Sequence, residues 1–178
     1  MKLILVLFAI LLCRSDATSQ YITEKDEFAG VTRIKQIPIT VWGTDSLHGK
    51  PFLSVVSDQY SSIRRIQGSL IVVNSNSSTV NMALRFVYTG RGWMFLEPLL
   101  RAKLDTIETI EGLEPDRDVL YGDIVRETIT FPISKEQLRE FTVRSYKFRL
   151  TTREGDAVDL DVSRLRGTWQ EMYKSFVL

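Results

Sequence analysis

Apolar and polar residues alternate in several stretches of the chain, and this alternation predicts β-strands. In the stretch 31–42, Ile37, Ile39 and Val41 occupy every second position, which is the period of a strand with one buried face. Pro38 lacks a backbone N–H donor, so the strand is expected at a sheet edge or a bulge. Short β-branched runs predict further strands at 52–57, 69–74 and 123–131.

The stretch 80–100 predicts a hairpin. Two apolar runs flank the sequence TGRG at 89–92, and its glycines can adopt the positive φ angles that tight connections need. Both runs are apolar at nearly every position, so we expect central strands that are covered on both faces. The acidic stretch 103–123 contains two glycines and a proline and is expected to be mainly loop.

The stretch 146–162 predicts a second hairpin, whose register follows from side-chain parity. Directly opposed residues of an antiparallel pair point to the same side of the sheet. A two-residue turn would set Leu150 against Asp159, whereas a three-residue loop at 153–155 sets Leu150 against Val158 and favours Gly155 as a left-handed residue. The second register also gives three matched pairs: Phe148 with Leu160, Arg149 with Asp159, and Lys147 with Asp161.

Two helices are predicted near the end of the chain. Ser134 followed by Gln137 forms a capping box, which predicts a short helix near 135–141. A second amphipathic helix is expected near 164–176 with Ser163 as its cap. Its apolar stripe consists of Leu165, Trp169, Met172, Tyr173 and Phe176. The fold class is therefore mainly β (α+β), an antiparallel β-sandwich-like sheet carrying these two helices.

The first twenty residues predict export. Ten uncharged apolar residues, 3–12, follow Lys2, and this run is half of the roughly 20 residues that a membrane-spanning helix needs. Such a run is typical of a signal peptide, with cleavage expected after Ala17 and an alternative after Ser19. Lipidation at Cys13 is the other alternative, which the bulk of Leu12 disfavours. The expected domains are a signal peptide at 1–17, a polar lead at 18–28 and one β-rich domain at 29–178.

Composition narrows the function classes. Loss of Lys2 and Arg14 takes the basic count from 23 to 21, and loss of Asp16 takes the acidic count from 22 to 21. With no clustered basic surplus, nucleic acid is not an expected partner. After cleavage no transmembrane span and no cysteine would remain, and His48 is the only histidine. Neither a metal site nor a cofactor is therefore expected.

Catalytic chemistry has little support in the sequence. A Ser-His-Asp arrangement could use only His48, and no nucleophile-elbow motif is present. Glycoside hydrolysis needs two facing carboxylates, and Glu127 is the candidate because it lies within an apolar-rich strand. The favoured interpretation is nevertheless an outward-facing Glu127, with Arg126 or Thr128 inward. No catalytic residue is therefore assigned.

Aromatic residues near predicted turns or strand ends are the candidate ligand contacts. Exposed aromatic side chains can stack on sugars, and four positions qualify: Trp42, Trp93, Tyr88 and Tyr121. The alternative for each is a place in the core. A cluster of two or three of them on one surface would favour carbohydrate binding.

Three segments carry a resemblance to a loose group of proteins. They are EKDEFAGVTRI at 24–34, RFVYTGRGWMFLEPLLRAKLD at 85–105, and VRETITFPISKEQLREF with YKFRL between 125 and 150. Together they resemble small exported bacterial β-rich proteins, of the kind common in Bacteroidota, whose function is unassigned. The acidic stretch after Asp105 departs from the short turn of that group. The resemblance implies a periplasmic or envelope β-sandwich-like domain.

The sequence thus predicts an exported, non-enzymatic binding or structural module of the periplasm or cell surface. Its candidate partners are carbohydrate or another envelope protein. Two alternatives stay open: a glycan-directed hydrolase that uses paired carboxylates, and a subunit of an envelope protein assembly.

Overall fold

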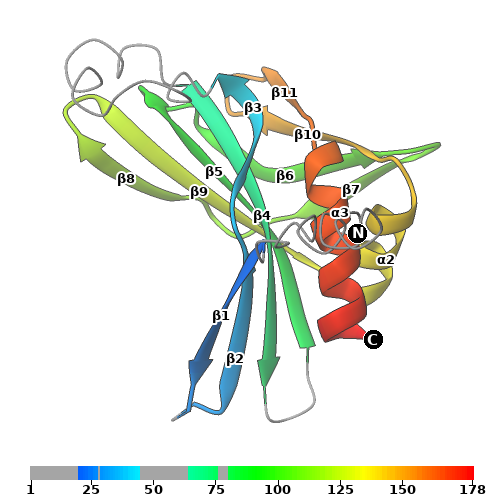
Figure 1. Cartoon of the computed structure of the whole chain (residues 1–178). Coiled ribbons are helices and arrows are strands. Elements are labelled where there is room, and N and C mark those ends of the chain that lie inside the picture. Colours follow the sequence, from blue (N-terminus) through cyan, green and yellow to red (C-terminus); the bar gives the residue numbers. More distant parts are fainter. Residues whose placement is uncertain (1–19, 28, 45–63, 76–79) are drawn as a thin grey trace, which may run out of the picture.

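The structure is a computed structural model that describes residues 20–27, 29–44, 64–75 and 80–178. The residues expected to form a signal peptide, which include Cys13, lie outside these ranges. His48 and the strand expected at 52–57 lie outside them too. Within them the chain forms two antiparallel sheets and two helices, as Figure 1 shows. The mainly β, α+β class expected from the sequence is confirmed. None of the described helices is long and apolar enough to cross a membrane.

Sheet A has seven strands in the order β1-β2-β4-β5-β9-β8, and β3 also pairs with β4. Strands β2 and β3 lie end to end against β4, because β2 pairs with 71–75 and β3 with 64–68. The break between them falls at Ile37 and Pro38, so the stretch 31–42 is two strands rather than the single edge strand expected from the sequence. Only β3 is an edge strand, because β2 lies between β1 and β4. The strands are β1 (Tyr21–Asp26), β2 (Val31–Gln36), β3 (Ile39–Thr44), β4 (Arg64–Ser75), β5 (Val80–Arg91), β8 (Asp116–Tyr121) and β9 (Ile124–Ile133).

Sheet B has four strands in the order β11-β10-β6-β7. The predicted register of β10 with β11 is confirmed, since Leu150 pairs with Val158 and Arg149 with Asp159, and Gly155 in the loop has φ 91°. The prediction that Lys147 faces Asp161 is wrong, because the strand pairing ends at Phe148 and Leu160. The strands are β6 (Leu96–Lys103), β7 (Ile107–Glu111), β10 (Lys147–Thr152) and β11 (Ala157–Leu160).

Two predictions for the middle of the chain are wrong. The runs in 80–100 form no hairpin, because β5 pairs with β4 and β9 in sheet A while β6 pairs with β7 and β10 in sheet B. The stretch 103–123 is not mainly loop, since it contains β7 and β8. Both strands carry many charged and exposed residues, so their apolar alternation is too weak to mark them.

The helices are α2 (Lys135–Val143) and α3 (Ser163–Met172), and a π-helical turn, η3 (Tyr173–Val177), follows α3. Both halves of the capping box at Ser134 and Gln137 are present. Ser163 is not the cap of α3: Val162 holds that position without a side-chain hydrogen bond. Instead, the Ser163 backbone N–H and hydroxyl both donate to Asp161 Oδ1, at 3.1 and 2.6 Å.

The core lies between the sheets and beneath α3. Figure 1 shows α2 and α3 in the wedge where the two sheets diverge. A Cβ atom at Gly68 of β4 would lie 2.9 Å from Leu165 Cδ1, so the helix approaches β4 where no side chain stands. Trp169 is fully buried, donates from Nε1 to Gln36 Oε1 at 3.0 Å, and meets Phe148 of sheet B edge to face. The stripe predicted for this helix therefore joins the two sheets.

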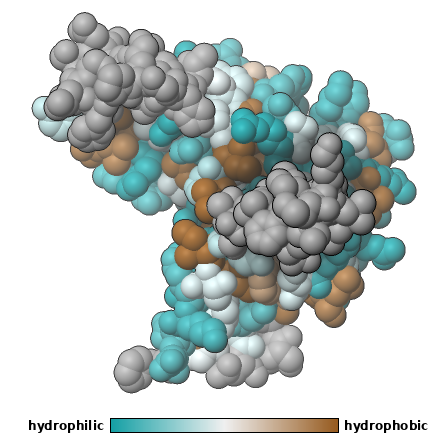
Figure 2. All heavy atoms as spheres, in the orientation of Figure 1, coloured by the Kyte–Doolittle hydropathy of each residue, from teal (hydrophilic) through white to brown (hydrophobic). Residues whose placement is uncertain are grey.

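An arm of sheet A extends beyond this core. It consists of β1, β2 and the adjoining ends of β4 and β5 (Figure 1). The residues 21–26, expected as part of a polar lead, form β1 and pair along β2. In Figure 2 the described residues at the free end of the arm are coloured mainly teal and white, so this end is largely hydrophilic.

Candidate functional site

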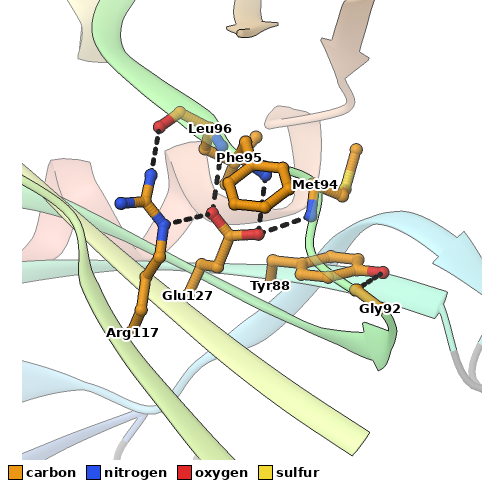
Figure 3. A network of polar contacts seen from close by, with 7 residues as sticks. All are labelled: Tyr88, Gly92, Met94, Phe95, Leu96, Arg117 and Glu127. Carbon is orange, nitrogen blue, oxygen red and sulfur yellow. Dashed lines mark hydrogen bonds and ion pairs between the residues drawn. The ribbon is translucent and has the colours of Figure 1, made fainter. Parts of the chain in front are cut away.

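The connection 92–95 carries the chain from sheet A to sheet B and is held by a buried carboxylate. Three successive backbone N–H groups donate to Glu127 of β9 (Figure 3): Met94 to Oε1 at 2.5 Å, Phe95 to Oε1 at 2.9 Å and Leu96 to Oε2 at 3.0 Å. Glu127 has no exposed surface. The interpretation of Glu127 as an outward-facing residue is therefore wrong.

Arg117 of β8 supplies the compensating charge. Its Nε donates to Glu127 Oε2 at 3.3 Å, and its Nη2 donates to the Leu96 carbonyl at 3.4 Å. Burying a carboxylate is costly unless it is paired and hydrogen-bonded, and this one accepts from four donors. It touches no second carboxylate in the hydrogen bonds and ion pairs of the described residues. The geometry thus gives Glu127 a structural role in shaping the connection.

Phe95 adopts a backbone conformation that bulky residues avoid. Its φ is 51°, the single positive value among the described non-glycine residues, and such strain costs about 1–3 kcal/mol. The conformation is fixed from both sides, since the Phe95 N–H donates to Glu127 and its carbonyl accepts from the Arg153 N–H at 2.8 Å. The Arg117 guanidinium lies 5.7 Å from the ring centroid. The connection is therefore a rigid feature that presents two aromatic residues, Trp93 and Phe95.

Tyr88 supports the start of the same connection from below. It is fully buried, and its hydroxyl donates to the Gly92 carbonyl at 3.3 Å (Figure 3). A Cβ atom at Gly90 would lie 2.2 Å from this hydroxyl, so the ring needs a glycine beside it. Burial raises the pKa of the Tyr88 hydroxyl, which keeps it protonated as a donor.

Trp93 and Trp42 line one groove where the two sheets meet. The groove has a volume of about 310 Å³, and its polar lining includes Arg64, Glu154 and Asp156. The register of β3 against β4 shifts between Thr40 and Trp42, which sets Trp42 opposite the buried Ile66. Because opposed residues share a face, the bulge directs Trp42 to the inner side of sheet A. The Arg64 guanidinium lies 5.8 Å from the Trp42 ring centroid.

A second groove follows β3 and shares Trp42 with the first. It has a volume of about 580 Å³ and is lined by the residues from Pro38 to Gly43, with Gln67, Asp161 and Arg164. The Asp161 N–H donates to the Val41 carbonyl at 2.8 Å. The hydrogen bonds from Ser163 hold the pKa of the Asp161 carboxyl below its usual range. Both grooves together make Trp42 the central residue of this surface.

The four aromatic candidates therefore lie in three different environments. Trp42 and Trp93 come together in one groove, and both are partly exposed. Tyr88 is buried beneath the connection, so it can only support a ligand contact. Tyr121 is 82% exposed on β8 and lines neither groove.

Sequence reasoning missed the polar half of the groove. Arg64 is exposed at the start of β4, and its guanidinium lies over Trp42 of the neighbouring strand. Glu154 and Asp156 belong to the loop of the predicted hairpin 146–162. The strand register of this hairpin does not show which other part of the protein lies next to the loop. Comparison of the chain with protein-family models, with curated proteins and with solved structures finds no match in any of the three.

Proposed function

We propose that this protein is an exported, non-catalytic module that binds carbohydrate in the groove between Trp42 and Trp93. One observation carries the proposal: two partly exposed tryptophans, distant in sequence, line the same groove together with charged side chains. Sugar rings have apolar C–H faces that aromatic rings can cover and hydroxyls that charged groups can hydrogen-bond. A groove with aromatic walls and a few polar groups suits such ligands.

The size and rigidity of the groove agree with a small ligand. Its volume of about 310 Å³ lies at the lower end of ligand cavities, which span about 300–1,000 Å³, so it suits one or two sugar units. Glu127 and Tyr88 fix the connection that carries Trp93. A contact residue that is already ordered loses little entropy on binding, which favours affinity.

Binding to a glycan array followed by calorimetry on the glycans retained tests the proposal. We expect Trp93→Ala to weaken binding at least about tenfold, as for truncation of an aromatic contact at the centre of a site. Because Trp93 also packs against the core, Asp156→Asn serves as a second variant that removes only an exposed groove carboxylate. Tyr121→Ala is the matched control, since it removes an exposed aromatic ring outside the groove.

Two results would contradict the proposal. One is an array on which no glycan is retained by the folded protein. The other is equal loss of affinity in Trp93→Ala and Tyr121→Ala, which would show that the contact is not specific to the groove.

A glycan hydrolase is the second candidate, because Glu154 and Asp156 both line the groove. Glycosidases place their two carboxylates about 5–10 Å apart on either side of the scissile bond. Here both acids come from the loop between β10 and β11. They therefore line the same wall of the groove, rather than facing each other across it. Incubation of a bound glycan with the protein and measurement of new reducing ends decides the matter. Reducing ends that Glu154→Gln abolishes would replace the binding module with a hydrolase.

Export is part of the proposal and has its own measurement. The apolar run behind Lys2 supports a signal peptide, and the resemblance to exported β-rich proteins agrees with it. The intact mass of the protein from its own host should match a chain that starts at Thr18 in the soluble fraction. A lipid-modified chain that starts at Cys13 in the membrane fraction would instead identify a lipoprotein.

A further inference from the structure

The outer face of sheet B carries four cationic side chains on two adjacent strands. Lys103 of β6 lies directly opposite Lys147 of β10, and Arg101 lies directly opposite Arg149. All four are exposed, whereas the alternate residues of both strands, such as Ala102 and Phe148, are buried. The four cations therefore share the solvent-facing side.

This arrangement is unfavourable for the fold by itself. Opposed residues of an antiparallel pair have Cβ atoms about 4.5–5.5 Å apart, and like charges at this distance destabilise the pair. Arg149 has an acidic partner, since its Nε lies 2.5 Å from Asp159 Oδ1. Among the described residues Arg101, Lys103 and Lys147 form no ion pair. The whole chain has a formal charge of only +1, so positive charge is concentrated in this cluster on an otherwise nearly neutral protein.

The cations form a strip that is two strands wide. On β11 the strip is bounded by Asp159, and on β7 by Thr109 opposite Arg101 and by Ile107 opposite Lys103. Residues two apart on a strand are about 6.6 Å apart, so the four side chains leave the sheet from the corners of a small rectangle. A hollow of about 270 Å³ is lined by all four cations, together with Ile107, Phe148 and the bordering Asp159. The strip can therefore hold anionic groups along one direction.

We propose that this strip binds a single extended anionic glycan, whose sulfate or carboxylate groups lie over the two like-charge pairs. The bound anions would offset the repulsion within each pair. An unstructured nucleic acid strand is less suited, because its bases need exposed aromatic rings for stacking, and the aromatic residue at the hollow, Phe148, is only 2% exposed. Asp159 lines one side of the same hollow, so the anionic groups of the ligand would lie over β6 and β10 and away from β11.

The proposal is independent of the tryptophan groove. The groove lies at the loop end of β10 and β11, and its lining shares no residue with the cationic hollow. Trp93→Ala should therefore leave the binding of an anionic glycan unchanged, and loss of one site would not imply loss of the other.

Calorimetry with a heparin octasaccharide at low ionic strength tests the proposal. We expect binding that weakens with salt, and we expect Lys147→Glu to reduce the affinity about tenfold or more, since it reverses a charge inside the strip. The same variant should raise the melting temperature, because Lys103 then faces a carboxylate. Loss of binding together with a gain of stability excludes unfolding as the cause. Lys25→Glu is the matched control: it changes the net charge equally at an exposed position on β1.

Four results would overturn the proposal. These are no heparin binding by the folded protein, equal binding of neutral dextran, and equal loss of affinity in Lys147→Glu and Lys25→Glu. The fourth is binding of an oligothymidylate or of phosphatidylserine vesicles without binding of heparin, because it would assign the strip to another class of partner.

Discussion

Two groups of charged residues in this protein are arranged in opposite ways. Glu127 lies inside, with no exposed surface, and accepts hydrogen bonds from three backbone N–H groups and from Arg117. Arg101, Lys103, Lys147 and Arg149 lie outside on sheet B, where like charges stand opposite each other. The buried charge is fully compensated, and the exposed charges are largely uncompensated.

The difference follows from the cost of a charge in each place. Inside a protein an unpaired charge or donor is expensive, so every partner of Glu127 is needed for stability. On the surface water hydrates each cation, so a like-charge pair destabilises the sheet by far less than an unpaired charge inside the protein would. A compensated buried charge therefore indicates a structural role. An exposed cluster of like charges without partners carries an electrostatic repulsion, and a bound ligand of opposite charge can offset it.

Removal of the buried carboxylate should have the largest effect. We expect Glu127→Ala to lower the free energy of unfolding by about 3–5 kcal/mol, because it leaves three backbone N–H groups without an acceptor and Arg117 without its partner. Denaturant unfolding measures the loss. A domain of this kind has about 5–15 kcal/mol in total, so this loss is a large part of the stability of the fold.

Two further variants show whether the loss of stability comes from the buried network; they are Glu127→Gln and Glu154→Ala. The amide of Glu127→Gln keeps one oxygen acceptor and should therefore lose less stability than Glu127→Ala. Glu154→Ala removes an exposed carboxylate of the groove and should change the free energy of unfolding by less than about 0.5 kcal/mol. Equal losses in Glu127→Ala and Glu154→Ala would show that the buried network is not what holds the connection.

The sequence predicted the parts of the fold that depend on local signals. The capping box at Ser134 and Gln137 needs only neighbouring residues, and it is present in full. The register that sets Leu150 opposite Val158 follows from parity within one hairpin. Both depend on contacts that the chain makes with itself over short distances.

Features that depend on distant residues could not be predicted in this way. The runs in 80–100 resembled a hairpin, because the sequence does not show that Glu127, on another strand, holds the connection between them. For Glu127 itself, a shift of one residue in the strand register turns the side chain from the inner to the outer face. The apolar residues on both sides of Glu127 did not show which of the two faces is buried. The cationic strip could not be predicted, because Lys103 and Lys147 stand opposite each other only when β6 pairs with β10.

A charge-reversal cycle at the outer pair should have an intermediate effect. Lys103→Glu and Lys147→Glu should each raise the free energy of unfolding by up to about 1 kcal/mol, because each creates a pair of opposite charges. The double variant restores a like-charge pair and should lose both gains, so the two changes are not additive. Denaturant unfolding at low and high salt measures the cycle, and the coupling should shrink at high salt. Additive gains that persist at high salt would show that the residues act through packing.

The smallest effect is expected at Asp159, the acid that borders the strip. The hydrogen bond from Arg149 holds the pKa of the Asp159 carboxyl below its usual range. Ionised Asp159 therefore stabilises the fold fully at any pH above the usual pKa of an aspartate. The contribution is lost as the pH falls through the lowered pKa. Asp159→Asn should therefore be slightly less stable than the unmodified chain at neutral pH, by less than about 1 kcal/mol, and the difference should close on acidification. Unfolding measured from neutral to strongly acidic pH checks this, with the exposed Asp156→Asn as control. A difference that stays constant at acidic pH would mean that Asp159 acts through its shape, and the border of the strip would then not be electrostatic.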